Sequence, residues 1–566
     1  MMYISDKTKE LSTYDAIVIG SGISGGWAAM ELCRKGMKTL LLERGRDVKH
    51  LQDYPTANLN PWDFKFGYNN PMEDQKRNPV QSTSYNPTNK HFYVEDMEHP
   101  YIQEQPFNWL RGYQVGGRSL TWGRQCYRFS DLDFEANARE GIAVDWPIRY
   151  KDIAPWYSYV ESFIGVSGQK ENLSQLPDGE FLSPMELNCI EKHLADSIKK
   201  NDHDRLLTIA RVANLTRGWD NRGPCQYRNL CSRGCPFGGY FSSNSSTIPA
   251  AMATGNLTLR PFSIVTEILY DEQKGKAKGV RIIDTLSNEV YEFYSKIVFV
   301  NASTVATAGM LLNSTSSRFP NGFGNGSAQI GHNLMDHHSS AGASGTHDQF
   351  ADQYYKGRRP SGFLIPRFRN LHDNEKLDFK RGYNIQGHGE RQEWSDKVNG
   401  LSGFGSDFKA QLTTPGPWTV WMAGWGECLP YYENKIALDP DQKDKWGQPL
   451  IRIDFSFKEN EHNMMTDIRN SSGEMLEKAG FRNVDTFNYK KPGGSTIHEM
   501  GTVRMGRDPK TSVLNQFNQM HEVKNVFITD GSCMTSSASQ NPSLTYMALT
   551  ARASQFAFEQ LKNGNL

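Results

Sequence analysis

Three glycines near the N-terminus have the spacing that binds the phosphates of a dinucleotide. Gly20, Gly22 and Gly25 follow a short β-branched run that begins at Tyr14, and a helical stretch follows them. In such a turn the first glycine permits the tight bend, the second lets the backbone approach a pyrophosphate, and the third allows close helix–strand packing. Glu43 ends the next predicted strand, where an acidic side chain accepts hydrogen bonds from ribose hydroxyls. The pattern predicts a bound dinucleotide. A glycine-rich packing turn is the alternative, and the motif alone does not separate NAD from FAD.

Three of the eight cysteines lie within eleven residues. Five residues separate Cys225 from Cys231, three separate Cys231 from Cys235, and Pro236 follows. Thiolates on such close spacings hold iron–sulfur clusters, and a C-x₃-C-P ending recurs in ferredoxin-type sequences. Tetrahedral zinc normally has a fourth Cys or His ligand, which this loop lacks. Three ligands therefore predict a [3Fe-4S] cluster, with buried free thiols or a zinc site completed from elsewhere as alternatives. Five isolated cysteines are expected to be packing residues: Cys33, Cys126, Cys189, Cys428 and Cys533.

Several longer segments resemble the glucose–methanol–choline (GMC) oxidoreductases. Residues 112–122 are similar to the segment that covers the flavin in that family, and residues 145–157 to the helix that follows it. The resemblance continues in 331–337, 498–506 and 540–545, and it covers nearly the whole chain except 47–105 and parts of 340–480. It implies an α/β GMC-type fold. In that fold a Rossmann-like FAD-binding domain of discontinuous segments is joined to a largely β substrate-binding domain.

The same resemblance implies FAD as the dinucleotide. The cofactor-binding residues are then Gly20, Gly22, Gly25 and Glu43, together with Gly116, Gly117, Ser119, Thr121, Trp122, Asp530 and Gly531. Some family members attach the flavin covalently through a histidine just before a tryptophan. Thr121 occupies that position here, before Trp122, and threonine cannot form the histidyl bond. FAD is therefore expected to be bound non-covalently.

His498 and Asn541 match the two active-site segments of the family. Oxidation of an alcohol by hydride transfer to the flavin N5 needs a base for the hydroxyl proton, and histidine titrates near neutral pH. An amide can donate to the developing alkoxide without competing for the proton. We therefore assign His498 as the general base and Asn541 as its orienting partner, with a purely structural histidine and a turn or cap asparagine as the alternatives. The adjacent His337 and His338 are interpreted as structural rather than as a metal site.

The cysteine loop is similar to that of large subunits of bacterial FAD-dependent sugar dehydrogenases. In these proteins the cluster carries electrons away from the flavin to a protein acceptor such as a cytochrome. A small partner subunit carries the export signal. Among such relatives the glucoside 3-dehydrogenases are nearest, which implies oxidation of a secondary hydroxyl, C3 of a glucoside, to a 3-keto product. The alternatives are an oxygen-using oxidase of the same fold without a cluster, and a non-catalytic flavin-binding subunit. Four tryptophans are candidates for stacking on a sugar, with core packing as the alternative: Trp394, Trp418, Trp421 and Trp425.

The elements that must position these residues follow from hydrophobic patterns. Strands are predicted over 14–20, 39–42, 280–284, 296–300 and 525–530. Helices are predicted from the end of the glycine turn through Cys33, and over 150–165, 304–312 and 543–561. The FAD-binding domain is assigned to 12–46, 106–170, 240–340 and 491–566. An excursion over the flavin site takes 47–105, an insertion with the cysteines takes 171–239, and the substrate-binding domain takes 341–490.

Composition argues against binding to nucleic acid or to a membrane. The chain has 566 residues with 63 basic and 63 acidic side chains, so it lacks the positive excess that binding to nucleic acid or an acidic membrane requires. No apolar run approaches the ~20 residues of a membrane-spanning helix. The first thirteen residues are polar and show no signal peptide or twin arginine. We therefore expect a periplasmic location if a partner subunit exports the protein, and a cytoplasmic one otherwise.

Overall fold

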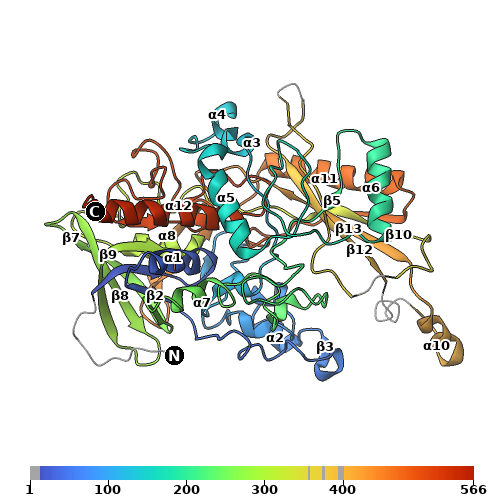
Figure 1. The fold of residues 1–566 in the computed structure, drawn as a ribbon, viewed down its shortest axis with the longest axis horizontal. Coiled ribbons are helices and arrows are strands. Elements are labelled where there is room, and N and C mark those ends of the chain that lie inside the picture. Colours follow the sequence, from blue (N-terminus) through green and yellow to red (C-terminus); the bar gives the residue numbers. More distant parts are fainter. Residues whose placement is uncertain (1–12, 355–356, 373–375, 393–400) are drawn as a thin grey trace.

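A computed structural model describes residues 13–354, 357–372, 376–392 and 401–566. Two large sheets organise these residues, and each has its own hydrophobic core. In Figure 1 the first sheet lies on the left with both described termini, and the second lies on the right. The predicted α/β fold class is confirmed, whereas the domain boundaries stay predictions.

The seven-stranded sheet contains the nucleotide turn. Its order is β6-β2-β1-β9-β8-β7, with β17 also pairing with β9. The strands that meet around β1 are parallel and almost wholly apolar, as expected for strands buried on both faces. Their bounds are β1 (Thr13–Ile19), β2 (Thr39–Leu42), β6 (Leu257–Arg260), β7 (Ser263–Asp271), β8 (Lys276–Asp284), β9 (Val290–Val300) and β17 (Val526–Ile528).

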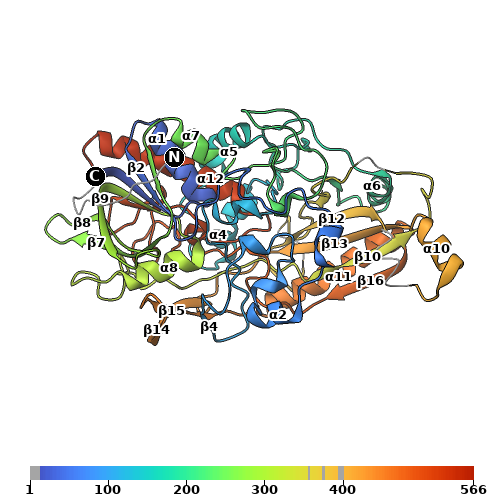
Figure 2. The same cartoon turned by 90° about the horizontal axis from the view of Figure 1, so that it is seen from below.

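Helices far apart in the sequence cover this sheet together. The first and last helices, α1 and α12, lie side by side in Figures 1 and 2. Helix α1 begins directly after the glycine turn, and α12 begins just after Asn541, so both helix starts lie at the same end of the sheet as the candidate site. The helices on and around this sheet are α1 (Ile23–Arg34), α5 (Tyr150–Ile164), α7 (Thr247–Met252), α8 (Thr304–Asn313) and α12 (Ser543–Lys562).

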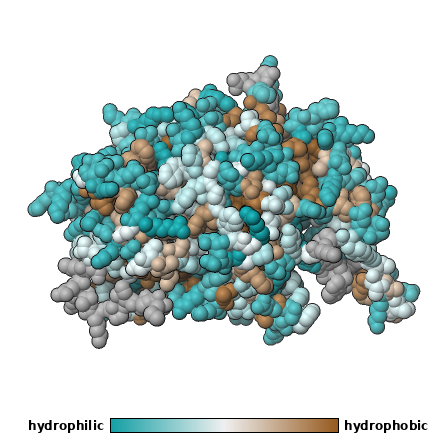
Figure 3. Space-filling model, in the orientation of Figure 1, coloured by the Kyte–Doolittle hydropathy of each residue, from teal (hydrophilic) through white to brown (hydrophobic). Residues whose placement is uncertain are grey.

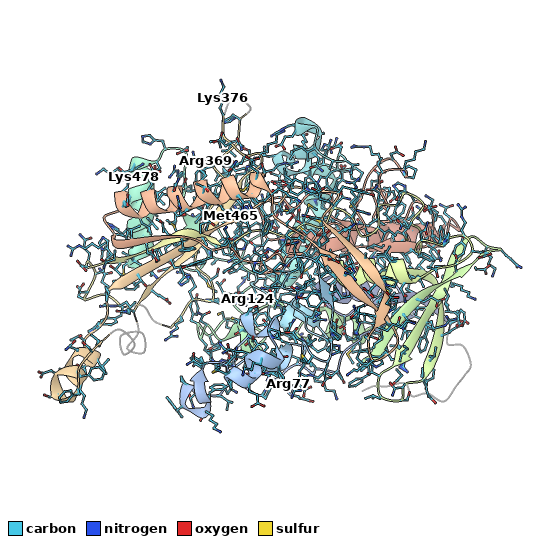
Figure 4. All side chains as sticks on the ribbon, turned by 180° about the vertical axis from the view of Figure 1, so that it is seen from behind. Arg77, Arg124, Arg369, Lys376, Met465 and Lys478 are labelled. Carbon is cyan, nitrogen blue, oxygen red and sulfur yellow. The ribbon has the colours of Figure 1, made fainter. Side chains whose placement is uncertain are left out.

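The six-stranded antiparallel sheet has the order β16-β10-β13-β12-β11-β5. Helix α11 (Glu459–Lys478) packs across one face of it, and Figure 4 shows Met465 and Lys478 along this helix. Helix α6 (Cys189–Asn201) contacts the same region. The strands are β5 (Thr208–Ile209), β10 (Ala341–His347), β11 (Phe363–Ile365), β12 (Tyr383–Arg391), β13 (Trp418–Gly426) and β16 (Arg482–Asn488).

Helix α11 was not predicted from the sequence. Its apolar residues are few, and its middle contains Asn470, Ser471, Ser472 and Gly473, which have low helix propensity. Buried Met464, Ile468, Met475 and Leu476 nevertheless form one face against the sheet. Tertiary packing therefore stabilises a helix that local sequence preference does not favour.

The remaining elements are short or peripheral. A small sheet is formed by β14 (Lys435–Lys443), β15 (Pro449–Asp454) and β4 (Ile102–Gln103), and a separate strand is β3 (Lys65–Tyr68). The other helices are α2 (Met72–Arg77), α3 (Asp131–Phe134), α4 (Ala136–Glu140) and α10 (Gly405–Thr413). On the face drawn in Figure 3, hydrophobic residues are scattered in small groups among hydrophilic ones. Across the described ranges, no helix is both long and apolar enough to span a bilayer.

Candidate active site

A cavity of about 670 Å³ joins the nucleotide turn to the second sheet. This volume is within the usual range for ligand sites. Its walls contain most of the residues predicted to bind FAD or to act in catalysis, namely Gly20, Gly22, Glu43, Gly117, Ser119, Thr121, Trp122, His498, Asp530, Gly531 and Asn541. Gly25 and Gly116 do not line the cavity. They lie where Gly25 packs against the Gly20 backbone and Gly116 packs against Asn244.

The glycine turn has the geometry that phosphate binding requires. Gly20 has a φ of +92°, and a Cβ on Gly25 would lie 1.7 Å from the Gly20 carbonyl oxygen. A Cβ on Gly22 would meet nothing within 4 Å, because this residue faces the cavity. Gly22 is also the N-cap of α1 and caps it with no side-chain hydrogen bond. The first N–H groups of α1 and its positive dipole end are thus available to an anion.

Glu43 is buried beside this turn. One of its oxygens accepts hydrogen bonds from the backbone N–H and hydroxyl of Ser21, and the other accepts one from the N–H of Gly45 at 2.9 Å. Burial raises the pKa of this carboxyl group despite those bonds. Glu43 therefore holds the turn in place, and it lines the cavity where a ribose would be bound.

Residues 117–122 form a second wall of the cavity, and Gly116 just before them contacts the glycine turn. The Gly116 N–H donates to Ser21 Oγ at 2.9 Å, and the Ser243 N–H donates to Ser119 Oγ at 3.0 Å. Gly116 has a φ of +89°, and a Cβ there would lie 1.6 Å from Asn244 Oδ1. Only glycine therefore allows this approach.

The C-terminal side of the cavity is formed by Asp530 and Gly531. Asp530 accepts hydrogen bonds from the Ser303 N–H at 2.9 Å and from the Thr307 hydroxyl at 2.6 Å. Two buried polar atoms, Tyr546 Oη and Asn301 Nδ2, belong to cavity-lining residues and have no hydrogen-bond partner within the described part of the chain. Orphaned polar atoms beside a phosphate-binding turn are what a bound polar cofactor would satisfy. The residues present thus fit FAD.

The two predicted catalytic side chains meet in the cavity wall. Asn541 Nδ2 lies 3.5 Å from His498 Nε2, although the residues are 43 positions apart. The His498 N–H donates to the buried Asp336 carboxylate at 3.1 Å, which fixes the backbone at this position. Burial, followed by the proximity of His337 and Arg118, lowers the pKa of His498 well below 6.5.

Sequence reasoning missed two side chains that contact this pair. His337 Nδ1 lies 2.9 Å from His498 Nδ1. The adjacent residues His337 and His338 therefore have different roles, because His337 belongs to the site whereas His338 packs against Phe457. Gln386, on β12, donates from Nε2 to Asn541 Oδ1 at 2.7 Å. The segment 331–337 was matched to the family, but nothing local showed that His337 would reach His498. Gln386 belongs to no motif that would have indicated a place in the site.

The cavity side of the second sheet carries aromatic and polar groups. Gln386, His388, Trp421 and Trp425 alternate along paired β12 and β13 and all line the cavity. The Trp421 side chain is 38% exposed, and its ring lies nearly parallel to that of Phe487, with ring centroids 6.1 Å apart. Trp418 is instead 1% exposed in the core, so the packing interpretation holds for it. Trp394 lies outside the described residues.

The three clustered cysteines line one small pocket of their own. The Tyr227 N–H donates to Cys225 Sγ at 3.4 Å, and the Gly239 N–H donates to Cys235 Sγ at 3.3 Å. Tyr240 Oη donates to the Leu120 carbonyl at 2.6 Å, which joins this loop to the wall of the large cavity. Within the ranges described, no three His, Cys, Asp or Glu side chains form a group that could hold a metal ion. Burial raises the pKa of Cys225 to about 11, so the free thiol is protonated at neutral pH.

The lowered pKa of His498 gives a pH prediction. A general base works only when deprotonated, so the acid limb of kcat/KM should fall below about pH 6.5, the usual histidine value. Arg118, His337, Asp336 and Glu499 are the charged or titratable groups around it. The pKa of His337 is also lowered, whereas burial, followed by Glu499, raises the pKa of Asp336 to about 7. The check is kcat/KM against pH with an artificial acceptor. An acid limb centred above pH 7 would contradict the assignment.

A dinucleotide site on a parallel sheet that opens on a His–Asn pair is typical of a nucleotide-dependent oxidoreductase. The chain belongs to the GMC oxidoreductase family, whose N-terminal profile matches residues 14–339 and whose C-terminal profile matches residues 430–550. It is therefore an FAD-dependent oxidoreductase that acts on alcohol or sugar CH–OH groups.

Individual relatives are distant but match over almost their full length. The 2-methyl-1,2-propanediol dehydrogenase of Mycolicibacterium austroafricanum is 27% identical, over 96% of this chain and 94% of its own. The fructose dehydrogenase large subunit of Gluconobacter japonicus is 24% identical, over 98% and 100%. A formate oxidase structure from Aspergillus oryzae shares the fold, with a TM-score of 0.61 and 14% identity over 98% of this chain and 99% of that chain.

Proposed function

We propose that the protein is a dehydrogenase that oxidises a secondary hydroxyl group of a sugar or glycoside, with C3 of glucosides as the position and 3-keto-glycosides as the product. The observation that carries this proposal is one cavity that joins the His498–Asn541 pair to the aromatic, polar face of β12 and β13. An aromatic face beside amide and imidazole groups suits a sugar, whose ring has both apolar C–H faces and hydroxyl edges. Two full-length relatives are named as dehydrogenases, of a diol and of fructose.

In this proposal each residue of the site has its own role in the reaction. His498 Nε2 accepts the proton of the substrate hydroxyl group, and Asn541 Nδ2 donates to the same oxygen as negative charge develops on it. The wall from Ser119 to Trp122 and the glycine turn would hold FAD, which when bound supplies the acceptor for the hydride. Trp421 orients the sugar ring by contact with its C–H face.

The cysteine loop extends the proposal to electron transfer. Cys225, Cys231 and Cys235 would hold a [3Fe-4S] cluster, whose chemistry is the transfer of single electrons to a protein acceptor of the cytochrome type. Three thiols around one pocket, with backbone N–H groups donating to two of the sulfur atoms, suit such a cluster, because hydrogen bonds to sulfur tune its potential. Free thiols are the alternative. Burial raises the pKa of Cys225 and of Cys235, so uptake of iron would have to release their protons.

The proposal includes a partner. The fructose dehydrogenase relative is named as a large subunit, which means that it belongs to a protein of more than one subunit. By analogy, a small subunit with an export signal would accompany this chain and place it in the periplasm. Without such a partner the expected location is the cytoplasm.

Product analysis tests the substrate proposal. The enzyme is incubated with methyl glucoside and an artificial electron acceptor, and the product is identified by NMR. The proposal expects a 3-keto-glucoside and no turnover of the 3-deoxy analogue. A carbonyl at another carbon, or equal turnover of the 3-deoxy analogue, would contradict it. Rapid turnover with oxygen alone, by a preparation free of iron, would favour the oxidase alternative.

A further inference from the structure

We propose that two hydrogen-bond relays, which start at the neighbouring carbonyl groups of Ala538 and Ser539, fix the tautomer of His498 and the amide orientation of Asn541. In this proposal His337 and Gln386 are positioning residues. The inference rests on the assignment of His498 as the base, but it does not depend on which alcohol or sugar is oxidised.

The first relay runs through His337. Its Nε2 lies 2.8 Å from the Ala538 carbonyl oxygen and 3.3 Å from that of Ser537. Carbonyl oxygens only accept hydrogen bonds, so Nε2 carries the hydrogen. Burial lowers the pKa of His337 to about 4, so at neutral pH its Nδ1 has a lone pair and no hydrogen.

This tautomer dictates the next one. The 2.9 Å contact between the two Nδ1 atoms is a hydrogen bond only if His498 Nδ1 carries the hydrogen. Neutral imidazole has a single N–H, so His498 Nε2 is left with its lone pair. That nitrogen lies on the side of Asn541, in the cavity wall. The base is therefore in the tautomer that can accept a proton from substrate.

The second relay runs through Asn384 and Gln386. Asn384 Nδ2 donates to the Ser539 carbonyl group, which leaves Asn384 Oδ1 as an acceptor for Gln386 Nε2 at 3.0 Å. Gln386 Nε2 also donates to Asn541 Oδ1 at 2.7 Å. With its oxygen engaged, Asn541 presents Nδ2 to His498 and the cavity.

Both relays begin in one buried segment, Ser537 to Ser539. Ala538 has a φ of +53°, which is rare for a residue with a Cβ, and Ser537, Ala538 and Ser539 are buried. Strain of this kind persists only where the surroundings fix the backbone, and it gathers at functional sites. Here it turns two successive carbonyl groups toward β12 and His337.

The test of the first relay is direct. ¹⁵N-histidine NMR of the holoenzyme, with the signals assigned by comparison with His498→Ala, reports the tautomer without any turnover. We expect His498 as Nδ1–H. We expect His337→Leu to lower kcat about 10²–10⁴-fold with little change in KM and full FAD content, because the general base then loses the group that fixes its tautomer. His337→Asn, which keeps an acceptor, should stay within about tenfold of wild type.

A matched control is His193→Leu, since His193 Nε2 also contacts a backbone carbonyl, that of Ala479 at 2.7 Å, but lies on α6 away from the site. It should leave kcat unchanged. A wild-type His498 with Nε2–H, or equal losses in the Leu and Asn variants of His337, would overturn the first relay. Failure of methyl glucoside as substrate would leave the NMR result standing.

The Gln386→Glu variant tests the second relay by its pH dependence. An ionised carboxylate cannot donate to Asn541 Oδ1, whereas a protonated one can. The kcat of this variant should therefore be about 10²-fold low at pH 8, comparable to the loss of one oxyanion donor. It should recover as the pH falls and the carboxyl group is protonated. The other titratable or charged groups at the site are His498, His337, His388, Asp336, Arg118 and Glu499, and the wild type measured in parallel corrects for them. A pH-independent loss, or no loss, would overturn the second relay.

Discussion

Replacement of His498 by alanine is expected to lower turnover about 10²–10⁴-fold, the usual contribution of a positioned general base. The loss should be in kcat, because the methyl group of alanine can neither accept the hydroxyl proton nor hold the contact with Asn541 Nδ2. FAD content should be unchanged, because the side-chain partners of His498 are His337 and Asn541, which lie outside the glycine turn. Steady-state kinetics and the flavin absorbance of the purified variant provide the measurement.

The His193→Ala variant is the control for this substitution, since it removes an imidazole from α6 and should leave kcat intact. Unchanged turnover in His498→Ala would refute the base assignment and favour a flavin-binding subunit without catalytic function. Loss of FAD together with activity would instead show that His498 supports the cofactor site.

Replacement of Cys231 by serine is expected to abolish the cluster. Wild-type protein should contain about three iron atoms per chain, and the variant should contain almost none, because the middle thiolate of the loop is lost. Reduction of FAD by the sugar should be unaffected, whereas electron transfer to cytochrome c, used as the protein acceptor, should cease. Iron analysis and anaerobic kinetics separate the two half-reactions.

Cys189→Ser is the matched control, because Cys189 is a partly exposed, isolated thiol at the start of α6. It should keep both iron and electron transfer. Full iron content and full coupling in Cys231→Ser would contradict the proposed electron relay. Wild-type protein that contains no iron after anaerobic purification would leave the free-thiol alternative in place.

The nucleotide-binding half of the structure could be predicted from local patterns. The strand at Thr39–Leu42 and the helices that begin at Tyr150, Thr304 and Ser543 were all predicted at or near their observed bounds. A β-branched run, a glycine turn and an amphipathic helix are signals within about 30 residues, and the turn requires glycine for steric reasons. The GMC family assignment is confirmed by the matched profiles.

The surroundings of the catalytic pair could not be predicted. His337 and His498 are 161 residues apart, and Gln386 and Asn541 are 155 apart. These contacts depend on which strands pair in the second sheet and in which register, and no local pattern specifies either. For the same reason, the sequence could not show which tryptophan is buried and which is exposed. Trp418 and Trp421 lie on opposite faces of one strand. A shift of one residue in register would have exchanged them.

The visible spectrum of the anaerobic protein, before and after addition of methyl glucoside, shows directly whether the protein oxidises a glycoside and transfers the electrons. We expect the flavin absorbance to bleach rapidly and to leave the broad background of an iron–sulfur cluster. This result would support the oxidation of a glycoside and the electron relay in one experiment. A flavin that stays oxidised with methyl glucoside and with other sugars would contradict the proposed function.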